Sequence, residues 1–123
     1  MRALAAAPSL ANLRVLSVSG TRITAAGVDA VLNGPHWRLA GLWLSHCQLR
    51  RDVADVLAAS PRLARLQVLD VSMNDDIGAD DLAPLAESEY LSPHTELDIR
   101  GLYTGNAGVR AALRGRLGRR LSE

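Results

Sequence analysis

Few side chains in this sequence have a type and spacing that could support covalent chemistry. His46 and Cys47 are adjacent, and a histidine beside a cysteine is the arrangement that activates a thiolate nucleophile. Asp70 could approach His46 if the two residues lie on neighbouring strands. A catalytic centre, however, needs a nucleophile, a base and an orienting group in mutual reach, and no activated nucleophile is evident. We therefore expect no catalytic residue and no enzymatic activity.

Metal and cofactor chemistry have even less support. The three histidines and the single cysteine have no short ligand spacing, which a zinc site requires. All 14 basic residues are arginine and no glycine-rich phosphate loop is present, which excludes a nucleotide-binding P-loop. One cysteine forms no internal disulfide and is compatible with a reducing compartment. We expect no cofactor, no metal and a cytoplasmic location.

Charged residues are unevenly distributed, although the net charge of the 123 residues is only +1. Acidic residues gather between 75 and 89, and five arginines lie near the end of the chain: Arg110, Arg114, Arg116, Arg119 and Arg120. The arginines could contact nucleic acid, but the small net charge and the absence of interleaved aromatic residues favour a solvated helix surface. No apolar run approaches the roughly 20 residues that span a bilayer. We expect neither nucleic-acid nor membrane binding.

An internal repeat organises the chain. Each of the first three copies contains a leucine, two residues, a second leucine, one residue, an aliphatic residue and two further residues, followed by Thr21, Cys47 or Asn74. The second leucine falls at Leu16, Leu42, Leu69 and Leu97, so successive copies are 26, 27 and 28 residues apart. The fourth copy is the weakest match. A period of this length predicts a repeat architecture in which each copy is one structural unit.

Each unit combines a strand with a helix. The two aliphatic residues of the repeat core alternate with the period of two that is typical of a strand. The following residues have helical spacing: Val28, Val31 and Leu32; Val53, Val56 and Leu57; Leu82, Leu85 and Ala86; and Val109, Ala112 and Leu113. Thr24 and Asp52 are the expected N-caps, and the expected helix ends are Asn33-Gly34-Pro35 and Ser60-Pro61. Pro84 fits only the first turn of a helix that begins near Asp80 or Asp81.

The copies resemble the leucine-rich repeat, and the long period and the segment from Ile23 to Val28 are similar to the ribonuclease-inhibitor-like subclass and its bacterial relatives. This resemblance covers nearly the whole chain. It implies an α/β fold, a right-handed solenoid or horseshoe of about four repeats with parallel strands on the concave face and helices on the convex face. It also implies that the protein binds another protein on its concave face.

The repeat boundaries predict a single domain over 1–123. Residues 1–12 match the end of a repeat, the complete repeats are expected at 13–38, 39–65 and 66–93, and the last repeat with a C-terminal cap is expected at 94–123. Gly115 and Gly118 are expected to interrupt the last helix, with the arginines forming a polar outer surface. A chain that begins inside a repeat is either a piece of a longer array or has a vestigial cap. We expect a monomer.

Outward-facing strand residues are the candidates for partner binding, because they alternate with the core residues. Aligned across the copies, they form four columns: Val15, Gly41, Val68, Glu96; Ser17, Trp43, Asp70, Asp98; Ser19, Ser45, Ser72, Arg100; and Gly20, His46, Met73, Gly101. The predicted contact residues are Trp43, His46, Asp70, Met73, Glu96, Asp98 and Arg100. Trp43 is the main candidate because tryptophan is enriched at binding hot spots, although it could instead pack on a neighbouring side chain. The acidic residues could equally be ordinary solvated surface.

Two further residues are expected to be structural. Trp37 aligns with Leu10, Leu63 and Leu91 of the other copies, so we expect it in the core. Cys47 aligns with Thr21 and Asn74, and the resemblance implies that this position turns inward and hydrogen-bonds the backbone. We therefore expect a buried thiol rather than a reactive one.

Two alternative functions remain open. The resemblance extends to repeat proteins that activate small GTPases or recruit substrates for ubiquitin ligases, and Arg22, Arg50 and Arg51 lie near the strand exits, where an activating arginine could be placed. The second alternative is a structural piece of a longer array that has no partner of its own.

Overall fold

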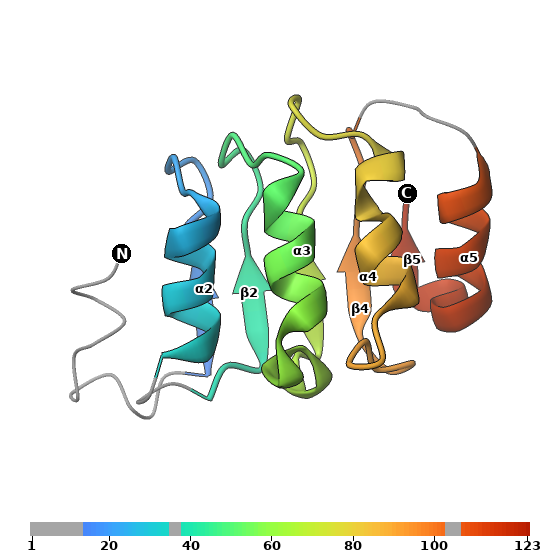
Figure 1. Ribbon diagram of the computed structural model, residues 1–123, viewed down its shortest axis with the longest axis horizontal. Coiled ribbons are helices and arrows are strands. Elements are labelled where there is room, and N and C mark those ends of the chain that lie inside the picture. Colours follow the sequence, from blue (N-terminus) through green and yellow to red (C-terminus); the bar gives the residue numbers. More distant parts are fainter. Residues whose placement is uncertain (1–13, 35–37, 103–106) are drawn as a thin grey trace.

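Strands and helices alternate along the chain in the computed structural model, which describes residues 14–34, 38–102 and 107–123 (Figure 1). The strands are β1 (Val15–Ser17), β2 (Gly41–Trp43), β3 (Val68–Asp70), β4 (Glu96–Asp98) and β5 (Leu121–Ser122). The α-helices are α2 (Ala25–Asn33), α3 (Asp52–Ala59), α4 (Ala83–Glu87) and α5 (Ala107–Leu117). Short 3₁₀ helices are η2 (Pro61–Arg65), η3 (Ala79–Leu82) and η4 (Gly118–Arg120).

The described strands form one parallel sheet in chain order, β1-β2-β3-β4-β5. Leu16, Leu42, Leu69 and Leu97 are neighbours across the first four strands, so the repeat spacing brings equivalent residues side by side. This confirms the predicted α/β class and the parallel sheet. The arrangement of alternating strands and helices is consistent with a solenoid.

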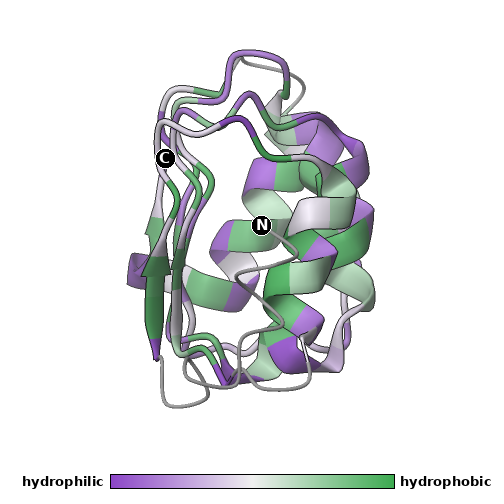
Figure 2. Cartoon of the chain, turned by 90° about the vertical axis from the view of Figure 1, so that its left-hand side faces the viewer, coloured by the Kyte–Doolittle hydropathy of each residue, from purple (hydrophilic) through white to green (hydrophobic). Residues whose placement is uncertain are grey.

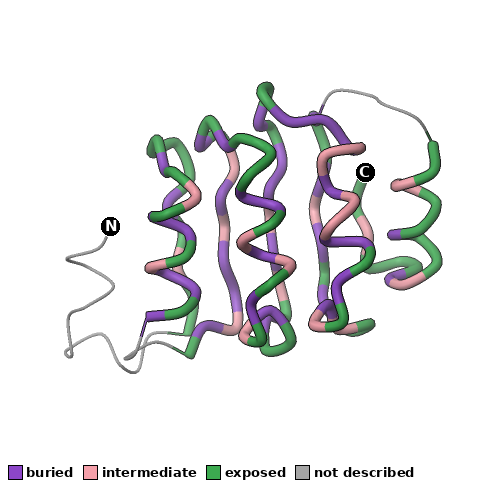
Figure 3. Tube along the Cα trace, viewed as in Figure 1, coloured by how far each residue is buried: buried purple, intermediate pink, exposed green. Residues whose placement is uncertain are grey.

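The helices cover one face of the sheet, and an aliphatic core lies between the two layers (Figures 2 and 3). Leu42, Leu69 and Leu97 reach this core from the strands and are at most 1% exposed. Leu57 and Leu85 reach it from the helices and are equally buried. One strand–helix unit alone leaves the apolar sides of both elements open, so the core exists only where neighbouring units stack.

The start of α2 was predicted correctly and the start of α3 was not. Thr24 caps α2, because its Oγ1 accepts a hydrogen bond from the Gly27 amide at 3.2 Å. The prediction that Asp52 is an N-cap is wrong: Asp52 is the first residue of α3 and Arg51 precedes it without a side-chain capping bond. Arg51 already has helical backbone angles, so Asp52 lacks the extended conformation of a capping residue. Its negative charge instead stabilises the first turn of α3, because it interacts favourably with the positive end of the helix dipole.

Ser60 and Gly34 follow α3 and α2 directly, as predicted. Ser60 also connects two repeats, since its Oγ donates to Asn33 Oδ1 at 2.5 Å and accepts from the Arg62 amide at 3.2 Å. Pro84 lies in the first turn of α4, as predicted, but the expected helix is divided into η3 and α4. Pro84 has no N–H for the Asp80 carbonyl, and the Ala83 amide donates to that carbonyl as a 3₁₀ bond.

The C-terminal end agrees with the prediction at Gly118 and differs from it at Gly115. Gly115 lies inside α5 and does not interrupt it. Gly118 ends the helix with a φ of +57°, a conformation in which glycine carries no steric cost. The chain then returns through η4 and adds β5 beside β4, a strand that the repeat did not predict.

The position shared by Thr21, Cys47 and Asn74 faces inward in two of the three units. Asn74 is 1% exposed and Cys47 is fully buried, as predicted. Cys47 Sγ donates to the Val18 carbonyl at 3.1 Å, and burial raises the pKa of this thiol. Thr21 is exposed, so the inward position is not reproduced in the first unit, where no strand precedes β1 among the described residues.

Trp37 and residues 1–12 lie outside the described residues, so the predictions of a buried Trp37 and of a partial N-terminal repeat concern positions that the structure does not describe. Across the described ranges, no helix has both the length and the apolar character needed to cross a membrane.

Candidate interaction surface on the sheet

The outward side chains of the strands, called the strand face below, lie on the side of the sheet opposite the helices. The register aligns Val15 with Gly41, Val68 and Glu96 in one row, and Ser17 with Trp43, Asp70, Asp98 and Ser122 in the next. The first two of the four columns derived from the repeat are therefore rows of neighbouring residues, about 4.8 Å apart from strand to strand. Trp43 lies directly beside Asp70 in this register.

Trp43 is half-buried, and the reason is a glycine on its own strand. A Cβ added at Gly41 would lie only 2.5 Å from Cζ3 and 2.8 Å from Cη2 of the indole. The ring therefore lies over the Gly41 backbone, in the space that any larger side chain would occupy. This contact holds the ring in place against the sheet, and its remaining surface borders the strand face.

Asp70 and Asp98 repeat one local arrangement in consecutive units. Asp70 Oδ1 accepts the Ser72 amide at 2.8 Å, and Asp98 Oδ1 accepts the Arg100 amide at 3.0 Å. The Arg100 side chain also bonds Asp98, with Nη2 at 2.7 Å from Oδ2. The side-chain hydrogen bond from Arg100 lowers the pKa of Asp98, with a smaller opposing effect of burial. Asp70 and Asp98 thus stabilise the backbone where β3 and β4 end, in addition to contributing negative charge to the strand face.

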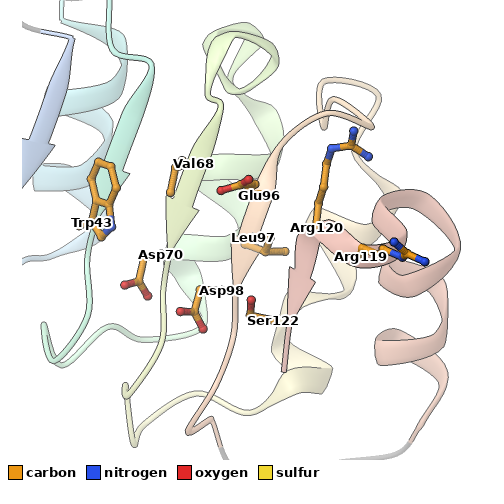
Figure 4. A pocket seen from close by; sticks show the side chains of 9 residues that line it. All are labelled: Trp43, Val68, Asp70, Glu96, Leu97, Asp98, Arg119, Arg120 and Ser122. Carbon is orange, nitrogen blue, oxygen red and sulfur yellow. The ribbon is translucent and has the colours of Figure 1, made fainter.

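A hollow of about 570 Å³ lies on the strand face between β2 and β5 (Figure 4). It is lined by Trp43, Val68, Asp70, Glu96, Leu97, Asp98, Arg119, Arg120 and Ser122. The indole lies at one side, the three carboxylates in the middle and the two arginines at the other side. The hollow joins an aromatic surface, a negative region and a positive region within four adjacent strands.

Four of the seven predicted contact residues line this hollow: Trp43, Asp70, Glu96 and Asp98. Arg119, Arg120 and Ser122 were missed, because they reach the strand face only through η4 and β5. A two-residue strand shows no alternation, and Leu121 does not follow the repeat motif. The only sequence signal was the arginine cluster itself, which we interpreted as helix surface.

His46 and Met73 lie at the strand exits and not among the residues that line the hollow. Their φ angles are +53° and +56°, and Gly20 and Gly101 in the same column have +79° and +75°. This position therefore requires a left-handed turn, which costs a residue with a side chain about 1 kcal/mol or more. Met73 covers Gly101, whose added Cβ would lie 2.2 Å from the Met73 sulfur.

The arginines considered for GTPase activation lie near acidic residues. Arg50 and Arg51 line a second hollow together with Asp76 and Asp81, and Arg22 lines a third with Arg50 and Asp52. Within the described ranges, no group of three or more His, Cys, Asp or Glu side chains could hold a metal ion.

Stacked strand–helix units with an open strand face define the class of a repeat protein that presents an extended surface. A family model described as "Leucine Rich repeat" matches residues 9–32 and 65–86, which contain Leu16 and Leu69 of the repeat. A search of the curated proteins finds no match. The family matches support a leucine-rich repeat protein, a class that is typically non-enzymatic and generally mediates protein–protein interaction.

Proposed function

We propose that this protein is an interaction module that binds a partner protein on its strand face, with Trp43 as the anchor. The observation that carries the proposal is the hollow itself: it combines an indole, three carboxylates and two arginines on one open surface. Interface centres are enriched in tryptophan and arginine. His46, Met73 and Arg100 are the proposed rim of this surface, beside the hollow.

Rigid presentation supports the proposal. Trp43 is held over Gly41, and Asp70 and Asp98 are each fixed by a backbone amide. Side chains that are already ordered lose little conformational entropy when a partner binds, so more of the interaction energy is retained as affinity. The strand face therefore resembles a preformed site more than a surface that must reorganise.

The finer features of the array are part of the same proposal. We infer a right-handed horseshoe of about four repeats, of the ribonuclease-inhibitor-like subclass, with the repeat boundaries given above. Under this proposal the strand face is concave, and the module acts as a monomer in the cytoplasm.

Site-specific cross-linking tests the proposal. A photoreactive amino acid replaces Val68, which lines the hollow, or Val56, which is half-buried on α3 and serves as the matched control. Both variants are mixed with lysate of the source organism and irradiated. We expect one discrete adduct from position 68, at least tenfold weaker when Trp43→Ala is added, and no such adduct from position 56.

Circular dichroism and thermal unfolding establish that each variant is folded. Equal adducts from both positions, or an adduct from position 68 that is unchanged by Trp43→Ala in a folded variant, would contradict the proposal that the strand face binds the partner.

A further inference from the structure

The charges that border the hollow are arranged in order across the sheet, and this order indicates what the partner carries. We propose that the strand face binds a protein segment in which a basic and an acidic side chain lie about 5 to 10 Å apart. The basic side chain lies among Trp43, Asp70 and Glu96, and the acidic side chain lies against Arg119 and Arg120. This inference rests on the function proposed above and specifies the chemistry of the partner.

The negative half of the hollow has two carboxylates that form no ion pair among the residues that the structure describes. Asp98 forms an ion pair with Arg100. Asp70 accepts a backbone amide but, within the described ranges, forms no ion pair, and neither does exposed Glu96. A basic group of a partner is the complement of these two charges.

Trp43 adds a second reason for a cation at this place. Its indole lies beside Asp70 in the strand register, and the ring surface not covered by Gly41 borders the hollow. A guanidinium or ammonium group is attracted by the face of an indole, and more strongly when a carboxylate is within reach. One basic side chain of the partner would contact both the indole of Trp43 and the carboxylate of Asp70.

The positive half consists of Arg119 and Arg120, whose surroundings differ from those of the other arginines of the C-terminal cluster. Arg116 donates to the carbonyls of Ala86, Ser88 and Leu91 at 2.6 to 3.0 Å. Arg110 and Arg114 pair with Glu123. Arg119 and Arg120 are exposed, line the hollow and form no ion pair among the residues that the structure describes.

The distance between the two halves defines the spacing in the partner. Asp70 lies on β3 and Glu96 on β4, two strands and one strand from β5, and Arg119 and Arg120 immediately precede β5. One to two strand spacings are about 5 to 10 Å. Residues two positions apart in an extended chain are about 7 Å apart and point to the same side, whereas residues three positions apart point to opposite sides. We therefore expect an extended segment that crosses the strands and carries its basic and acidic residues two positions apart.

Peptide display provides the test. A library of random displayed dodecapeptides is selected on the immobilised full chain, with the Trp43→Ala variant as counter-selection. We expect enrichment of arginine or lysine two positions from aspartate or glutamate. A synthetic, labelled copy of an enriched peptide should lose at least tenfold in affinity for Trp43→Ala, and about two- to fivefold for Glu96→Gln or Arg120→Gln.

Double-mutant cycles assign the two contacts. Replacing the basic residue of the peptide by norleucine should cost less affinity on Glu96→Gln than on the unsubstituted chain, and replacing its acidic residue by glutamine should cost less on Arg120→Gln, because one contact of each residue is already broken. Asp55→Asn, an exposed acidic residue of α3, is the control and should leave affinity unchanged.

The outcomes separate this inference from the proposed function. Peptides that require Trp43 but lack the two opposite charges would overturn the inference and leave the strand face as the binding surface. Enriched peptides that bind Trp43→Ala equally, or no enrichment, would contradict both. A dimer of the chain in sedimentation equilibrium that is dissociated by Glu96→Gln or Arg120→Gln would overturn the inference in favour of a second copy as occupant.

Discussion

The turn around Asn74 and the strand face both contain polar side chains, but only in the first are the hydrogen-bonding groups fully used. Asn74 Oδ1 accepts the amides of Cys47 and Leu49, and Nδ2 donates to the carbonyls of Leu44, Val71 and Ser72. On the strand face, Glu96, Arg119 and Arg120 are exposed. Buried polar side chains of this fold therefore stabilise it, whereas exposed polar side chains remain available to a partner.

The largest effect is expected from Asn74→Ala. The substitution leaves buried amides and carbonyls of two units without partners, and each unsatisfied group costs about 1–3 kcal/mol. We expect the free energy of unfolding to fall by about 3 kcal/mol or more, measured by urea denaturation. Asp75→Ala, an exposed neighbour, is the control and should change it by less than about 0.5 kcal/mol. Similar losses in both variants would contradict the structural role of Asn74.

Arg116→Ala is the next test, because it compares arginines of one cluster. Its guanidinium bonds three carbonyls of the preceding unit, so we expect a loss of about 2 kcal/mol in the same measurement. Arg119→Ala should cost less than about 0.5 kcal/mol. If Arg119→Ala is as destabilising as Arg116→Ala, then Arg119 is not free for a partner.

Gly101→Ala tests the left-handed backbone conformation that follows β4. Gly101 has a φ of +75°, and its new Cβ would meet the Met73 sulfur at 2.2 Å. We expect a loss of about 1–2 kcal/mol, from the left-handed backbone and the steric conflict together. The double variant with Met73→Ala should recover the steric part only, and full recovery would show that the backbone conformation carries no cost.

The smallest effect is expected at the Asp98–Arg100 pair. Arg100 lowers the pKa of Asp98, so the pair contributes stability above the unfolded pKa of this carboxyl, and that contribution is lost as the pH falls through the folded pKa. Arg100 is 63% exposed at its side chain, so solvent screening keeps the contribution small. Arg100→Gln should raise the pKa of Asp98, measured by carbonyl ¹³C NMR titration. An unchanged pKa would mean that the pair does not persist in solution.

Much of the fold could be predicted from the sequence because the repeat is local and periodic. Leu16, Leu42, Leu69 and Leu97 mark equivalent positions, and the register places them side by side. The inward position of Cys47 and Asn74 followed from the same alignment. Asp52 was misassigned because helix starts depend on the backbone angles of the preceding residue, which side-chain type alone does not define.

The candidate site was predicted only in part, because the repeat indicates which residues share a face but not how their side chains are oriented. Trp43, Asp70, Glu96 and Asp98 share rows of the repeat, so alternation alone indicated that they lie together. The position of the Trp43 ring over Gly41 depended on which way the side chain turns within its strand, a choice that composition and period do not express.

The sequence by itself determined the order of the strands and helices, their parallel pairing and the side of the sheet on which each repeat residue lies, because a strand has a period of two and every unit repeats it. Only the tertiary structure decided that α5 turns back at Gly118 and adds β5, since this strand is defined by pairing with β4 rather than by a pattern of its own. That pairing moves Arg119 and Arg120 from the end of a helix to the edge of the hollow. The positive half of the candidate surface therefore depends on long-range backbone hydrogen bonding, which no local signal in the sequence encodes.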